Sequence, residues 1–213
     1  MLRGSSLTRT LFLVAVAALV AACGTSPPAR MYTLSSLGTQ EVKSAGQQGA
    51  KPVSVSIAPV EVPDYLDRSQ IVTRDGTNGL KFAEFDRWGG SLGENMTSVL
   101  VENLSILLAS DRVFAYPRLR PEKPDYWVGV RILRLDCVPG DRVELKAQWL
   151  VTSGLETQDV ARRVSIFTER VSDGSYETLV AAVSRTVGQL SREITREIAT
   201  QRPGVVAGSA GQQ

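Results

Sequence analysis

Histidine is absent from the 213-residue sequence, and cysteine occurs only twice, as Cys23 and Cys137. Imidazole is the usual base of hydrolases that use a serine or cysteine nucleophile, and it is a common zinc ligand. The sequence therefore excludes Ser-His-Asp and Cys-His catalytic systems and the common zinc sites. The formal net charge is only +2, so charge gives no reason to expect nucleic acid as a partner or attraction to an anionic membrane.

Long hydrophobic runs are also missing, because the longest covers only residues 11–22. As a helix this run spans about 18 Å, well short of the roughly 30 Å hydrocarbon core of a bilayer. Arg3 and Arg9 precede it and no acidic residue does, a pattern typical of a secretory signal peptide. We therefore predict a signal peptide over residues 1–22, and its loss brings the net charge close to zero.

The signal peptide ends in Val20-Ala21-Ala22-Cys23, which has the form of a bacterial lipobox. The alternative is an ordinary signal peptide that happens to contain a cysteine. We predict that Cys23 is lipidated, with residues 23–30 as its tether, because the position, context and spacing of the motif all agree. Two or more acyl chains would anchor the protein stably without a membrane span. Residue 24 is glycine and not aspartate. By analogy with Gram-negative lipoprotein sorting, we expect the outer membrane, with the protein facing the periplasm.

The remaining sequence predicts one domain over residues 31–200 and a disordered tail over residues 201–213. With Cys23 lipidated, Cys137 has no partner for an intramolecular disulfide and is interpreted as a small core residue. Alternation of apolar and polar residues predicts strands, and spacing of three and four predicts two amphipathic helices. The predicted strands cover residues 53–62, 70–73, 80–85, 113–116, 126–138, 142–152 and 159–171, and the helices cover residues 92–109 and 176–200.

The order of these elements predicts a single two-layer α+β domain, in which a largely antiparallel sheet packs against the two amphipathic helices. We expect the first helix to pack, through Leu100, Leu104 and Leu107, on the sheet face that carries Val143, Leu145 and Trp149. The glycine-rich residues 89–93 lack the Gly-Lys-Ser/Thr ending of a phosphate-binding loop and are interpreted as a helix cap. Glu61, Asp64 and Asp67 are interpreted as a solvated loop and not as catalytic carboxylates. No cofactor, metal site or enzymatic activity is predicted.

Four residues fit neither the alternation of the predicted strands nor the spacing of the predicted helices. Tyr65, Leu66 and Arg68 lie in a proline-bounded loop, and Trp88 lies between a strand and the first helix. Such aromatic, aliphatic and arginine side chains concentrate the binding energy of protein interfaces. Burial in the core is the alternative for the loop and for Trp88. The hypothesis is that these four residues, brought close together, bind a partner.

These stretches also carry a resemblance to a known family, the PqiC-type lipoproteins, which are the auxiliary lipoprotein component of ABC-type transport systems. The features that match follow one another through most of the chain after Cys23: Tyr32-Thr33-Leu34, residues 55–60, residues 63–68, Gln70-Ile71-Val72, Arg87-Trp88, Asn103-Leu104 and residues 145–149.

The resemblance implies a non-enzymatic partner of an MCE-domain protein of the PqiB type and of its transporter, acting in lipid traffic and membrane integrity between the two membranes. A tube-shaped partner would present repeated surfaces, which favours a homo-oligomeric ring by symmetry. The alternative function is a structural or assembly lipoprotein that braces other envelope complexes.

Overall fold

The computed structural model describes residues 27–38, 52–117, 123–154 and 159–201. The predicted signal peptide, Cys23 and residues 202–213 lie outside these ranges, so what the sequence indicates about them stays a prediction. Within the ranges, no helix combines the length and the apolar character needed to cross a membrane.

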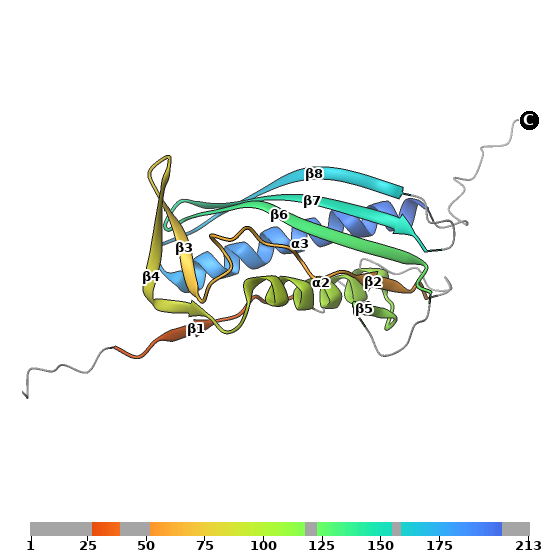
Figure 1. The fold of residues 1–213 in the computed structure, drawn as a ribbon, viewed down its shortest axis with the longest axis horizontal. Helices are drawn as coiled ribbons and strands as arrows, with labels where there is room; N and C mark the ends of the chain where they lie inside the picture. The colour runs from red at the N-terminus through yellow and green to blue at the C-terminus, as the bar shows by residue number, and fades with distance from the viewer. Residues whose placement is uncertain (1–26, 39–51, 118–122, 155–158, 202–213) are drawn as a thin grey trace, which may run out of the picture.

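A five-stranded sheet forms one layer of the molecule (Figure 1), in the order β5-β2-β6-β7-β8. β2 runs parallel to both β5 and β6, and β6, β7 and β8 are antiparallel neighbours. The strands are β2 (Val55–Ile57), β5 (Val113–Ala115), β6 (Tyr126–Val138), β7 (Arg142–Ser153) and β8 (Asp159–Arg170). The hairpin of β6 and β7 that the alternation predicted is confirmed, with Gly140 in its turn at a φ of +71°.

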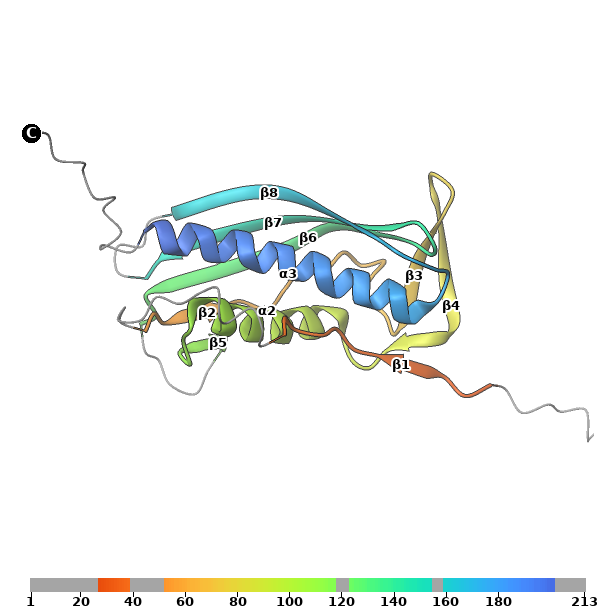
Figure 2. The same cartoon turned by 180° about the vertical axis from the view of Figure 1, so that it is seen from behind.

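The longer of the two helices in the described part of the chain covers this sheet. α3 (Tyr176–Thr200) lies along β7 and β8, and α2 (Leu92–Leu108) packs beside α3 and against β2 and β5, as Figure 2 shows. A helix of 25 residues extends about 37 Å, which matches the roughly 40 Å length of the long strands, whereas the 17 residues of α2 extend only about 25 Å.

The expected packing of the first helix is therefore corrected. The face of β7 that carries Val143, Leu145 and Trp149 is buried, but its main cover is α3 and not α2. Leu104 is fully buried, in the layer that α2 shares with α3, β2 and β5. Leu107 is only half-buried.

A second, smaller sheet stands at one end of the molecule, in the order β1-β4-β3. Its strands are β1 (Arg30–Tyr32), β3 (Gln70–Asp75) and β4 (Gly79–Trp88). The register pairs Gln70 with Arg87 and Val72 with Phe82. Ile71 is therefore the single residue of β3 that lies opposite residues 83–86 of β4. β4 bends at this point (Figure 1), and the hairpin of β3 and β4 points away from the edge where β1 pairs. The α+β class is confirmed, with its strands divided between two mixed sheets.

After β1 the chain crosses the two helices as a strap, defined here as residues 33–38. The Ser35 N–H donates to Ser184 Oγ of α3 at 3.1 Å, and the Leu37 N–H donates to Asn103 Oδ1 of α2 at 2.7 Å. A Cβ on Gly188 would lie 2.8 Å from Leu37 Cδ2, so glycine lets the strap approach α3 closely. The strap thereby ties the N-terminal side of the domain to both helices.

Candidate functional site

The proline-bounded loop turns tightly before β3. The Leu66 N–H donates to the Pro63 carbonyl at 2.8 Å, and the Arg68 N–H donates to the Leu66 carbonyl at 2.8 Å. This turn directs the Leu66 side chain into the core, where it is only 2% exposed. The sequence could not show this, because the direction of a side chain in a turn follows no periodic pattern.

Tyr65 fixes the same loop to the large sheet. Its hydroxyl accepts a hydrogen bond from the Leu135 N–H of β6 at 3.2 Å. Leu135 lies four residues beyond Arg131, which forms an isolated bridge with Glu61, and beyond the irregularity in β6. Tyr65 is half-buried, and desolvation raises its pKa. The phenol therefore stays neutral and serves as the acceptor that this backbone N–H requires.

Trp88 lies next to the loop, as the sequence hypothesis expected, but inside the core. Its backbone N–H donates to the Ser69 carbonyl at 2.7 Å, and its side chain is only 4% exposed. For the side chains of Leu66 and Trp88, the structure therefore shows the alternative that the sequence left open, burial in the core. The bend in β4 and the turn at residues 63–66 bring both side chains inward, and both contribute to the stability of the fold.

Arg68 is the residue of this group that the structure leaves at the surface. Its guanidinium carbon lies 4.3 Å from the centroid of the Phe82 ring, and Phe82 is 43% exposed. A cation above an aromatic ring is a favourable contact that leaves the outer side of the guanidinium open. The sequence analysis missed Phe82. Its pairing with Val72 places it beside the loop, and only the register of the hairpin could have revealed this.

We call Arg68, Phe82 and the exposed neighbours Asp67 and Ser69 the Arg68–Phe82 surface. A separate cleft of about 390 Å³, lined mainly by charged side chains, lies between the β3–β4 hairpin and the β6–β7 hairpin. Asp136 lines this cleft, where it accepts from Arg74 Nε at 2.6 Å and pairs with Arg134 Nε at 2.9 Å. Glu144 also bonds Arg134 and raises the pKa of that guanidinium.

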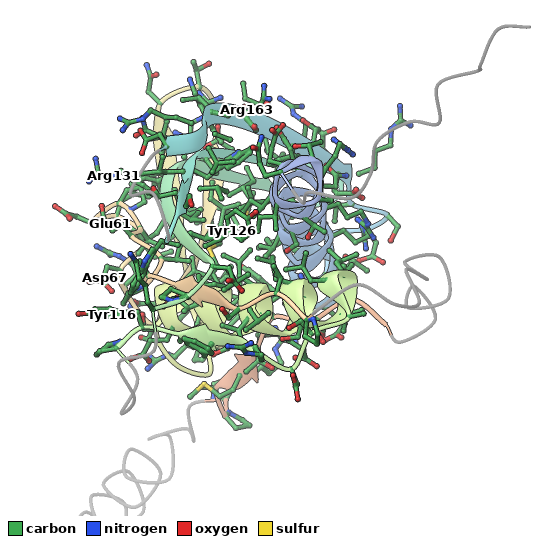
Figure 3. All side chains as sticks on the ribbon, turned by 90° about the vertical axis from the view of Figure 1, so that its right-hand side faces the viewer. Glu61, Asp67, Tyr116, Tyr126, Arg131 and Arg163 are labelled. Carbon is green, nitrogen blue, oxygen red and sulfur yellow. The ribbon has the colours of Figure 1, made fainter. Side chains whose placement is uncertain are left out.

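A second cleft, of about 230 Å³, opens on the face of the sheet away from α3. Glu61 and Arg131 form an ion pair at 2.6 Å at its edge, on the outer side of the sheet in Figure 3. Asp64 and Asp67 are exposed, so the three acidic residues of this region form no carboxylate cluster. Across the described residues no group of three histidine, cysteine or acidic side chains could hold a metal ion.

Cys137 is buried in β6, as the sequence predicted. Desolvation, with a smaller contribution from Asp136, raises the pKa of its thiol to about 12. The thiolate is the reactive form of cysteine, so this side chain acts as a core residue.

Comparison with known proteins identifies relatives of this chain. A family model described as ABC-type transport auxiliary lipoprotein component matches residues 32–195. The solved structure of an uncharacterised protein shares 18% identity and a TM-score of 0.64, over 81% of this chain and 99% of its own. A Xanthomonas campestris protein of the DUF330 family shares 15% identity and a TM-score of 0.63, over 82% and 100%. At these identities the structural likeness shows the fold alone. No curated protein matches the sequence.

Proposed function

Since this chain belongs to the family of ABC-type transport auxiliary lipoprotein components, we propose that it is a non-enzymatic partner of an MCE-domain protein of the PqiB type and of its transporter. In this role it supports lipid transport across the periplasm and membrane integrity. The observation that carries the proposal is the extent of the family match, because residues 32–195 include β2 to β8, α2 and most of α3.

The proposal places the protein at the outer membrane, facing the periplasm and held by acyl chains on Cys23. The lipobox and Gly24 support this placement. Cells that express Cys23→Ser and receive labelled palmitate should yield an unlabelled, uncleaved or mislocalised precursor, and continued labelling would refute lipidation at Cys23. Gly24→Asp should move the mature protein to inner-membrane fractions. If the native protein already lies wholly in those fractions, the outer-membrane placement is wrong.

We propose the Arg68–Phe82 surface, with the half-buried Tyr65 beside it, as the docking site for the MCE-domain partner. An arginine stacked on an exposed aromatic ring is typical of the residues that dominate interface energies. Leu66 and Trp88 are core residues, and their packing shapes the loop that carries this site. A tube end repeats one surface, so several copies of the chain would form a ring around it.

The docking proposal is tested by Arg68→Glu, with Arg170→Glu on β8 as the matched control. Both arginines are exposed, and both variants reverse one surface charge. We expect the first variant to lose copurification with the MCE-domain protein and to reduce the detergent resistance of cells, while it melts normally. Equal binding and equal protection by both variants would exclude this surface as the docking site.

The same copurification separates the proposed function from its alternative. A transport component should be recovered with the MCE-domain protein when the wild-type chain is isolated from membranes. Recovery with peptidoglycan or with a porin-assembly complex, and never with the MCE-domain protein, would contradict the transport role and favour a structural lipoprotein.

A further inference from the structure

The position of β1 limits how far the domain can lie from its membrane. Arg30, the first residue of β1, follows Cys23 by seven positions, and seven extended residues span at most about 25 Å. β1 is fixed to the domain, because the Gly89 N–H donates to the Tyr32 carbonyl at 2.7 Å and Arg30 pairs with Asp86 at 2.8 Å. The β1 edge of the small sheet therefore stays close to the bilayer, provided that Cys23 is anchored as proposed above.

The outward face of this edge combines an apolar and a basic side chain. On one face, the exposed Arg30 and the half-buried Tyr32 bind the buried carboxylate of Asp86. On the opposite face, Met31 of β1 lies beside Arg87 of β4. Met31 is 64% exposed, the highest value among the large hydrophobic side chains of the described residues. Transfer of so exposed an apolar side chain from water to an apolar environment would be favourable.

Arg87 is not committed to an internal carboxylate. Within the described residues it forms no ion pair, its buried Nε has no hydrogen-bond acceptor, and the side chain as a whole is half-buried beside Met31. A guanidinium lacking an acceptor is well suited to phosphate oxygens, which it binds through its planar fork. A long apolar side chain next to such a cation matches the boundary between acyl chains and headgroups.

We propose that Met31 and Arg87 contact the phospholipid surface to which Cys23 is anchored, with Met31 among the headgroups and Arg87 bonded to lipid phosphate. The near-zero net charge of the mature chain gives no long-range attraction. The tether replaces it, because it holds this face at a high effective concentration next to the lipid. The contact turns the β3–β4 hairpin away from the membrane, since that hairpin points away from β1 in both views (Figures 1 and 2).

The experiment uses the acylated protein in vesicles of phosphatidylethanolamine and phosphatidylglycerol. A thiol-reactive fluorophore is attached to Met31→Cys or, as the matched control, to Ile166→Cys on β8, which is 56% exposed. Cys137 is buried and does not compete for the label. We expect blue-shifted emission and strong quenching by nitroxide-labelled lipid at position 31, with neither effect at position 166. Arg87→Glu should weaken the quenching at position 31, and Arg87→Lys should largely preserve it.

The outcomes separate this contact from the anchor on which it rests. Failure of the protein to bind vesicles would refute anchoring through Cys23, and the membrane contact with it. A vesicle-bound protein whose label at position 31 stays in water and unquenched would refute the membrane contact alone. A label at position 31 that is blue-shifted but insensitive to lipid nitroxide would also refute it, because a protein, such as a second copy of this chain, would then cover Met31.

Discussion

Leu66→Ala is expected to destabilise the domain strongly, although the residue lies in a loop. The side chain is only 2% exposed, and the substitution removes three carbons, worth roughly 2.5 kcal/mol of transfer free energy at about 0.8 kcal/mol each. A residual cavity adds to this cost, and buried Leu→Ala changes generally cost about 2–5 kcal/mol. Because the turn around Leu66 can partly collapse, we expect a loss of about 3 kcal/mol. For a domain of this size the melting temperature should fall by about 6–12 °C.

The measurement is urea unfolding of the mature protein in mild detergent, followed by the fluorescence of its three tryptophans. Arg68→Ala is the control, because it removes a surface contact worth about 0.5–1 kcal/mol. The two variants should differ in the urea concentration at the midpoint of unfolding. The slope of the unfolding free energy against urea concentration should stay the same, which would show a change in stability and not in the compactness of either state. A loss below about 1 kcal/mol for Leu66→Ala, or equal losses for both, would refute the assignment of Leu66 to the core.

Three further predictions concern the fold. Leu104→Ala, at a fully buried position of α2, should lower the free energy of unfolding by about 2–5 kcal/mol in the same urea assay; a loss below about 0.5 kcal/mol would put this side of α2 outside the core. Ellman's reagent at pH 8 should modify Cys137 only after unfolding, because burial raises the thiol pKa to about 12, and rapid modification of the folded protein would contradict that burial. Hydrogen bonds from Ser175 and Thr178 lower the pKa of Asp173 from 3.8 to about 2, so the stabilising effect of this carboxylate should be complete above about pH 4 and lost as the pH falls to about 2. Asp173→Asn should flatten this part of the profile of melting temperature against pH, and a profile identical to that of the wild type would refute the role of the carboxylate.

The sequence predicted those elements whose pattern is local. β6 and α3 have the predicted bounds, and α2 differs by one residue, because a strand or helix that buries one face repeats its apolar residues at a fixed spacing. The N-cap of α2 is Ser91, within the residues 89–93 that the sequence indicated as a helix cap, although the Ser91 side chain forms no capping hydrogen bond. These signals lie within a few residues of one another.

The candidate site depended on contacts between distant parts of the chain, and these could not be predicted. Phe82 reaches Arg68 only because β4 bends and shifts its register against β3. Leu66 and Trp88 broke the periodic pattern because they follow a turn and a bend, yet both are core residues. Which helix covers the long strands depends in the same way on the matching lengths of α3 and β7, which no local pattern expresses.

The strap has a consequence for how the domain responds to mechanical tension. If Cys23 is anchored as proposed, a pull from the membrane along β1 acts parallel to the strand, so its hydrogen bonds to β4 and the Arg30–Asp86 pair are loaded together and not one after another. Beyond β1, the bonds at Ser184 and Asn103 pass any remaining tension to α3 and α2. Under the proposed anchoring and docking, the N-terminal end of the domain is thus held by two successive sets of bonds, and the domain can keep its fold while the distance between bilayer and partner changes.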